Sequence, residues 1–177
     1  MRKLVVYTLL SVDGVAESPD RFIFDFDEEM YTNLSRVIET QDAVLLGRGT
    51  YEEWASDWPD SNHEPFASFI NGVQKYVATS TQPATSWANT TVIDEPVPQF
   101  VRRLKEQPGA DIGVHGSIRL ARSLFESGLV DELRLVIAPA VARSGRRLFE
   151  GNDDLRKLKL LRAAGTPSGA LLVDYRC

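Results

Sequence analysis

The sequence predicts an α/β fold with a mostly parallel central sheet, an antiparallel C-terminal hairpin and helices packed on the sheet. Up to about residue 128, short apolar runs alternate with segments of helical periodicity, as in strands joined by helical crossovers. After residue 133 strand follows strand, and a turn containing Gly165, Pro167 and Gly169 indicates a hairpin. Residues 4–10 are apolar on both faces, which is typical of the centre of a covered sheet.

The elements follow from this pattern in chain order. Strands are expected at residues 4–10, 42–46, 75–78, 90–93, 111–115, 133–137, 158–161 and 171–175. A first helix is expected from Asp27, because acidic residues favour the positive end of the helix dipole. Further helices are expected from Thr50, after Pro98, and from residue 118 to a stop at Gly128. Residues 57–65 are expected to form a loop.

Length and composition indicate one domain spanning residues 1–177. The net charge is −5 and the pI is near 5.1, which argues against a nucleic-acid or anionic-membrane binder. No apolar run approaches the ~20 residues that cross a bilayer. The single cysteine, Cys177, makes no internal disulfide, so we expect a cytoplasmic protein without a cysteine metal cage.

Residues suited to binding an anion follow three of the expected strands. They are Gly47, Arg48 and Thr50 after the second strand, Thr79, Ser80 and Thr81 after the third, and Gly116 and Ser117 after the fifth. Each group has a simpler explanation as a turn or a helix cap. Because ligands of open α/β sheets bind beyond the carboxyl ends of the strands, their coincidence favours a phosphate site. The pattern is neither a dinucleotide fingerprint, since Glu52 replaces its third glycine, nor a Walker loop.

Three stretches carry a resemblance to a known family: LLGRGTYEEW, KYVATST and VHGSIRLARSLFESGLVDELRLVIAPAVARSGRRLF. They resemble the dihydrofolate reductase superfamily, in the branch of the C-terminal reductase domain of the riboflavin-pathway deaminase-reductase. The resemblance implies a three-layer fold, with helices on both faces of the sheet. It also implies NADPH as cofactor and hydride transfer to a small heterocycle or imine. The most similar activity is reduction of 5-amino-6-(5-phosphoribosylamino)uracil, and a homodimer is expected.

The resemblance also implies roles for individual residues. Gly47, Arg48 and Thr50 match the loop around the cofactor phosphates, with Arg48 on the 2′-phosphate. The adenosine side is matched by Thr79, Ser80 and Thr81, and the pyrophosphate and nicotinamide turn by Gly116, Ser117 and Ile118. Residues 11–16, including Val15 and Ala16, match a mobile loop over the nicotinamide. Two departures are Ser117, where folate reductases have a second glycine after a cis bond, and Ala142-Arg143, where relatives often have Leu-Gly.

Two carboxylates are candidates for supplying the proton that accompanies hydride transfer. Asp13 ends the first strand and lies in the loop expected to cover the nicotinamide, although an Asx turn would also explain an aspartate there. Asp27 opens the helix that lines the substrate pocket in relatives, although a helix cap is the favoured interpretation. Arg143, Arg146 and Arg147 could hold a substrate phosphate or form a solvated face. Trp54 and Trp58 could stack on a flat heterocycle or pack in the core.

Three alternatives stay open. A haloacid-dehalogenase-like phosphotransferase would need an aspartate nucleophile at Ser11, which the chain lacks. A non-catalytic homologue would bind the nucleotide without turnover. A dihydrofolate reductase is the third alternative.

Overall fold

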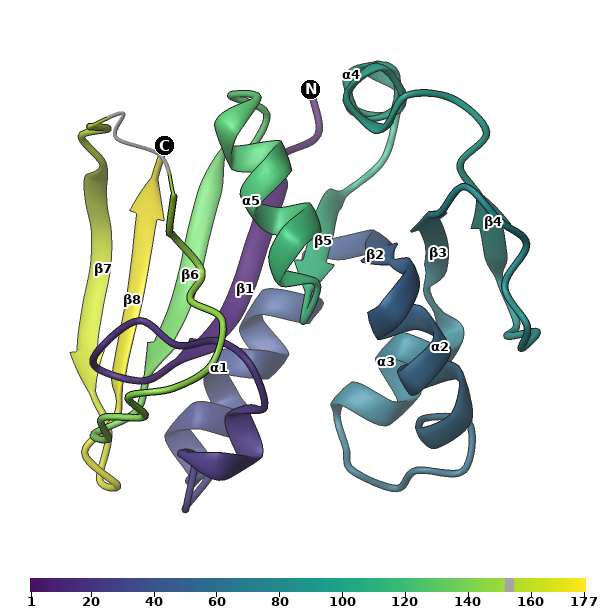
Figure 1. The fold of residues 1–177 in the computed structure, drawn as a ribbon. Coiled ribbons are helices and arrows are strands. Elements are labelled where there is room, and N and C mark those ends of the chain that lie inside the picture. The colour runs from purple at the N-terminus through teal and green to yellow at the C-terminus, as the bar shows by residue number, and fades with distance from the viewer. Residues whose placement is uncertain (152–154) are drawn as a thin grey trace.

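The computed structural model describes residues 1–151 and 155–177, and its centre is one eight-stranded sheet (Figure 1). The strand order is β4-β3-β2-β5-β1-β6-β8-β7. The strands are β1 (Leu4–Leu10), β2 (Gln41–Gly47), β3 (Gln74–Ala78), β4 (Thr90–Val92), β5 (Asp111–His115), β6 (Glu132–Ile137), β7 (Lys159–Gly165) and β8 (Leu171–Arg176).

The pairing confirms a mostly parallel sheet with an antiparallel C-terminal edge. All pairs from β4 through to β6 are parallel, whereas β8 runs antiparallel to both β6 and β7. The strand β7 forms the edge, and its residues are exposed apart from one that is half-buried. This order places the carboxyl ends of β3, β2 and β5 next to one another, with Gly47 opposite Ala78.

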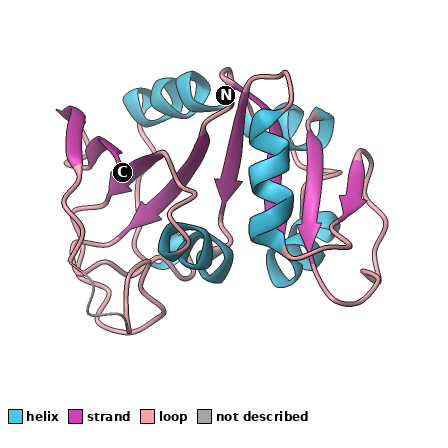
Figure 2. Cartoon of the chain, turned by 90° about the horizontal axis from the view of Figure 1, so that it is seen from above, coloured by secondary structure: helices cyan, strands magenta, loops and turns pink. Residues whose placement is uncertain are grey.

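Helices cover both faces of the sheet, as Figure 2 shows from above. The helices are α1 (Glu28–Ile38), α2 (Arg48–Asp57), α3 (Phe66–Gly72), α4 (Val97–Glu106) and α5 (Ile118–Glu126), with a 3-10 turn at Pro19–Arg21. One apolar cluster joins α4 and α5 to the face that carries Leu45 and Val114. A second joins α1, α2 and α3 to the face that carries Val44 and Val77. Apolar alternation along the buried strands therefore holds the three layers together.

Three helices differ from the prediction, and the smallest difference is that α4 begins at Val97 and includes Pro98 in its first turn instead of following it. The helix α2 begins at Arg48 rather than Thr50, so Gly49 lies inside its first turn. The helix α3 was not predicted, because seven residues are too few to show a helical period and no side chain caps its start. Phe66, Ala67 and Ile70 bury one side of it. Within the described part of the chain, no helix is long and apolar enough to cross a bilayer.

Candidate functional site

Two helix starts meet at the carboxyl edge of the sheet. The helix α2 follows Gly47 and α5 follows Ser117, and neither flanking residue caps its helix with a side-chain hydrogen bond. Instead, the Gly47 N–H donates to Ser117 Oγ at 2.9 Å, which ties the two turns together. Backbone N–H groups of both first turns are therefore left without a side-chain acceptor, and both positive dipole ends lie close together. This arrangement suits a ligand with two or more phosphates.

The Gly116 turn packs against α2. Gly116 has a φ of +66°, and a Cβ atom built on it would lie 2.8 Å from an edge carbon of Trp54 and 3.3 Å from the Thr50 methyl group. Only glycine fits both the backbone conformation and this close approach. Among the described residues the one cis peptide bond is Glu64–Pro65, so the Gly116–Ser117 bond is trans.

Arg48 and the hydroxyl residues after β3 lie at the same edge. The Arg48 guanidinium pairs with Glu52 one turn along α2, with Nε to Oε1 at 2.9 Å, and its side chain is 54% exposed. Thr79 directly follows the β3 residue paired with Gly47, and its hydroxyl donates to the Thr81 carbonyl at 2.8 Å. The structure therefore brings the three predicted loops together.

The other predicted cofactor residues have buried side chains. Val15, Ala16 and Ile118 are at most 8% exposed, and their side chains pack in the apolar clusters. The Val15 N–H is already bonded to Ser11 Oγ, and the Ala16 N–H to the Arg146 carbonyl.

A clasp formed by residues 11–17 and 138–148 follows β1 and β6, which are neighbouring strands. Asp13 is its central polar residue, accepting the backbone N–H groups of Ala142 and Arg143, both at 2.9 Å, and the Ser11 hydroxyl at 2.7 Å. The Arg147 guanidinium lies 3.7 Å from the same carboxylate. Hydrogen bonds from Ser11 and then Ala142 lower the pKa of Asp13 to about 2. An ionised carboxylate with these partners favours an anchoring role over proton donation.

Asp27 is the N-cap of α1, as the favoured interpretation of the sequence predicted. Its carboxylate accepts the Met30 N–H at 2.9 Å and the Ser168 N–H at 3.0 Å, which ties α1 to the β7–β8 turn. Partial burial raises the pKa of Asp27, but hydrogen bonds from Ser168, Thr166 and Met30 outweigh that effect and lower it. Asp27 is therefore also ionised at neutral pH.

The three arginines of the 138–148 segment lie in the clasp. Arg146 pairs with Glu17 at 2.7 Å, and Arg147 donates from Nε to the Asp13 carbonyl at 3.0 Å. Arg143 has a φ of +65°, in the region that glycine occupies most easily. The departure from Leu-Gly thus leaves an arginine in a left-handed conformation, with its N–H held by Asp13.

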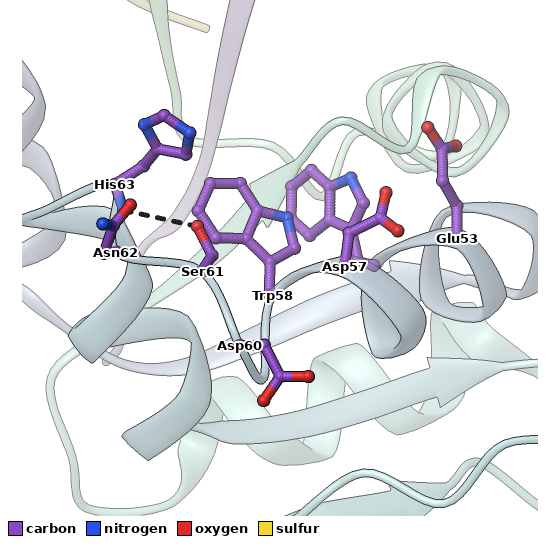
Figure 3. Close-up of a pocket in the computed structure, with 8 residues that line it drawn as sticks. Glu53, Asp57, Trp58, Asp60, Ser61, Asn62 and His63 are labelled. Atoms are coloured by element: carbon purple, nitrogen blue, oxygen red, sulfur yellow. Dashed lines mark hydrogen bonds between the residues drawn. The ribbon is translucent and has the colours of Figure 1, made fainter.

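A cavity of about 510 Å³ opens between α2 and the loop leading to α3 (Figure 3). It is lined by Glu53, Trp54, Asp57, Trp58, Asp60, Ser61, Asn62 and His63. The Trp58 indole lies centrally, with the Glu53 and Asp57 carboxylates on one side and His63 on the other. Both tryptophans are half-buried, so each has an exposed part. In the described part of the chain no cluster of acidic, histidine or cysteine side chains is arranged to hold a metal ion.

From the sequence, Trp54 and Trp58 were candidates for stacking on a flat heterocycle and residues 57–65 were expected to form a loop, but the eight residues were not assigned a shared site. Glu53 and Asp57 are four residues apart and share a face of α2, which is a readable signal. The positions of Asp60 and His63 depend on the path of the loop and have no such signal.

His115 is buried at the end of β5, beside the Gly116 turn. Burial lowers the pKa of His115 to about 3, and its Nε2 lies 2.8 Å from Gln41 Oε1. Its ring contacts Phe66 and Tyr7, with centroids 5.5 and 5.6 Å away. The imidazole is neutral at physiological pH and is part of the packing beneath the site.

The central sheet is covered by helices on both faces and has glycine-containing turns at its carboxyl edge. These features define a protein of the dihydrofolate reductase-like fold. The sequence pattern of the RibD C-terminal domain matches residues 2–172. The chain belongs to this reductase-like family of riboflavin biosynthesis. It is also similar to two proteins of Bacillus subtilis (strain 168), both named as uncharacterized. YyaP is 27% identical over 98% of this chain and 94% of its own length, and YwjB is 28% identical over 90% and 89%.

Solved structures share the fold at low sequence identity. A putative riboflavin biosynthesis protein from Shewanella sp. PV-4 superposes with a TM-score of 0.79 at 13% identity, covering 98% of each chain. A pyrimidine reductase-like protein from Corynebacterium diphtheriae gives 0.69 at 14% identity, covering 99% of this chain and 91% of that one. A deaminase/5-amino-6-(5-phosphoribosylamino)uracil reductase from Thermotoga maritima gives 0.68 at 14%, covering 99% of this chain and 56% of that one.

Proposed function

We propose that the protein is a cytoplasmic NADPH-dependent reductase that transfers a hydride to a small heterocycle or imine. The observation that carries this proposal is the meeting of two uncapped helix starts through the Gly47–Ser117 hydrogen bond. Family membership adds the class of reaction, of the same kind as reduction of 5-amino-6-(5-phosphoribosylamino)uracil.

The residues at this edge fit the phosphates of the cofactor. Backbone N–H groups of the first turns of α2 and α5 would donate to the pyrophosphate, and Arg48 would leave Glu52 to pair with the 2′-phosphate. Thr79, Ser80 and Thr81 would contact the adenosine side, next to β2. Bound there, NADPH would supply the hydride.

The residues after β1 have a supporting role in this proposal. Val15 and Ala16 would form the backbone wall of the nicotinamide site, and Asp13 would hold that wall in place through the clasp. Neither Asp13 nor Asp27 carries a proton at neutral pH, so neither is assigned as the proton donor. We further propose a homodimer that pairs through the exposed edge strand β7.

The same observation favours a second candidate, a non-catalytic homologue that binds the nucleotide without turnover. The two candidates separate when NADPH binding and NADPH oxidation are measured on the same preparation. Oxidation with any member of a panel of cyclic imines and aminopyrimidines supports the reductase. Tight NADPH binding without oxidation across the panel supports the non-catalytic homologue, and absence of binding contradicts both.

A further inference from the structure

The α2–α3 cavity differs in charge from the loops at the sheet edge. Three of its eight lining residues are carboxylates, and neither lysine nor arginine lines it. Glu53, Asp57 and Asp60 are all exposed, so an approaching ligand meets their charges directly. A phosphorylated or carboxylated ligand would be repelled, because its negative charge next to these carboxylates would raise the free energy of binding.

The cavity also offers aromatic surface. The rings of Trp54 and Trp58 meet edge to face with centroids 5.9 Å apart, and the Phe66 ring packs against Trp58 with centroids 4.8 Å apart. Half-buried indoles held in this way present a fixed flat surface. Indole faces attract cations more strongly than other aromatic side chains do. Carboxylates beside indoles are therefore suited to a flat, positively charged ring.

Two of the three carboxylates destabilise the helix that carries them. Glu53 and Asp57 are like charges four residues apart, and Asp57 ends α2, where the helix dipole disfavours a negative charge. No basic residue lies in the last turn of α2 to offset them. An arrangement that costs stability in this way is typical of residues kept for binding.

Trp54 connects the cavity with the proposed cofactor turn. The same indole that lines the cavity approaches Gly116 so closely that a Cβ atom there would lie 2.8 Å away. A ring bound in the cavity would therefore share a wall with the Gly116 turn. This shared side chain places the cavity next to the turn that the proposed function assigns to the nicotinamide.

A cationic substrate also removes the need for a proton donor. When a hydride adds to the carbon of a C=N⁺ bond, the π electron pair moves to nitrogen and neutralises its charge. NADPH becomes NADP⁺, and the product is an uncharged tertiary amine. No proton is transferred, which agrees with the ionised state of Asp13 and Asp27.

From these observations we propose that the α2–α3 cavity binds a flat, unphosphorylated cyclic iminium or similar heterocyclic cation as the substrate to be reduced. This inference rests on the proposed reductase function and names the substrate class of that site. It separates this chain from enzymes whose substrates carry a ribose phosphate. Of the three arginines that could have bound such a phosphate, Arg146 is paired with Glu17 and Arg147 with Asp13, whereas Arg143 is held in the clasp through its backbone N–H.

Three probes of one shape and different charge test the proposal by calorimetric titration of the full chain. They are 2-methyl-3,4-dihydroisoquinolinium, the uncharged 3-methyl-1,2-dihydronaphthalene and the anionic 3,4-dihydronaphthalene-2-carboxylate. We expect the cation to bind roughly tenfold more tightly than the uncharged probe, from the carboxylates and indoles together. Equal affinity for all three probes, or a preference for the anion, would overturn the proposal.

Substitutions locate the binding. Asp57→Asn should lower the affinity for the cation roughly twofold to fivefold and leave the affinity for the uncharged probe unchanged. It should also raise the thermal midpoint of unfolding. Trp58→Leu should lower the affinity for both the cation and the uncharged probe. The matched control is Glu106→Gln on α4, an exposed carboxylate outside the cavity, which should change neither affinity. Cation binding that is insensitive to Asp57→Asn and Trp58→Leu would place the site elsewhere and refute the inference.

NADPH titrations on the same proteins keep the two proposals separate. Cation binding in the cavity without any NADPH binding would overturn the reductase function and the substrate role of the cation. NADPH binding without a cation preference would overturn the substrate class alone. With both bound, NADPH oxidation should accompany reduction of the iminium, and Asp57→Asn should raise KM more than it lowers kcat.

Discussion

The turns after β2 and β5 and the clasp after β1 and β6 use backbone donors in opposite ways. At the turns, Gly47 and Ser117 bond to each other and leave the first turns of α2 and α5 without side-chain caps. In the clasp, the Asp13 carboxylate accepts two backbone N–H groups and a hydroxyl. Helix starts without side-chain caps indicate a place for a ligand, whereas donors satisfied by a carboxylate indicate a fixed wall beside it.

The largest expected effect on stability comes from adding a side chain where the Gly116 turn contacts Trp54. Gly116→Ala adds a methyl group 2.8 Å from the indole in a left-handed conformation, and should lower the free energy of unfolding by about 2–5 kcal/mol. Gly128→Ala is the control, because Gly128 has the same φ of +66° but nothing within 4 Å. The control should lower the free energy of unfolding, measured in urea, by only about 1–2 kcal/mol. Equal losses would mean that the Trp54 contact is unimportant.

Ser117→Ala removes the acceptor that joins the two helix starts. The partly buried Gly47 N–H loses its partner, so the free energy of unfolding should fall by about 1–3 kcal/mol. NADPH affinity should fall with it, because the two turns are no longer held together. Ser127→Ala, which removes an exposed hydroxyl at the end of α5, should change stability by less than about 0.5 kcal/mol. A Ser117→Ala protein as stable as the wild type would show that the link is not needed.

Asp13→Asn tests the clasp through its pH dependence. Because the folded-state pKa of Asp13, about 2, lies below its ordinary value of 3.8, its contribution to stability is present above pH 3.8 and is lost as the pH falls through about 2. The variant should therefore be less stable than the wild type at pH 5, with a difference that narrows towards pH 2. Asp20→Asn on the exposed 3-10 turn is the control. A difference that is constant with pH would argue against the ionised anchor.

The smallest effect is expected at the left-handed Arg143. Arg143→Gly relieves a backbone conformation that costs a non-glycine residue about 1–2 kcal/mol, partly offset by the greater freedom of glycine when unfolded. A gain of up to about 1 kcal/mol in the free energy of unfolding is expected. Ala142→Gly, at the neighbouring position, should lose stability. A loss at Arg143 would show that its side chain contributes more than its backbone costs.

The sheet and most helices could be predicted because their signals are local. A continuous apolar run marks β1, apolar alternation marks β6, and helical spacing of Met30, Leu34 and Val37 marks α1. The boundary of α2 was less clear, because Gly49 within its first turn resembles a loop residue. The helix α3 was missed, since it has only seven residues and begins without a side-chain cap.

The environment of the site residues could not be predicted in the same way. The partners of Asp13 are the N–H groups of Ala142 and Arg143, which lie 129 and 130 residues further along the chain. No local pattern reports such a contact, so the sequence left Asp13 as a candidate acid. The cavity was missed for a similar reason, because Trp54 and Asp60 meet only when the loop after α2 is folded.

The central claim is that Arg48 and the two joined helix starts hold a dinucleotide with a 2′-phosphate. It is tested most directly by measuring the dissociation constants of NADPH and NADH for the wild type and for Arg48→Ala, with Arg102→Ala on α4 as control. A charge-assisted arginine–phosphate contact is worth about 1.5–3 kcal/mol, so the wild type should prefer NADPH roughly tenfold to hundredfold. Arg48→Ala should abolish most of that preference and leave NADH affinity unchanged. Equal affinity of the wild-type protein for the two cofactors would contradict the claim.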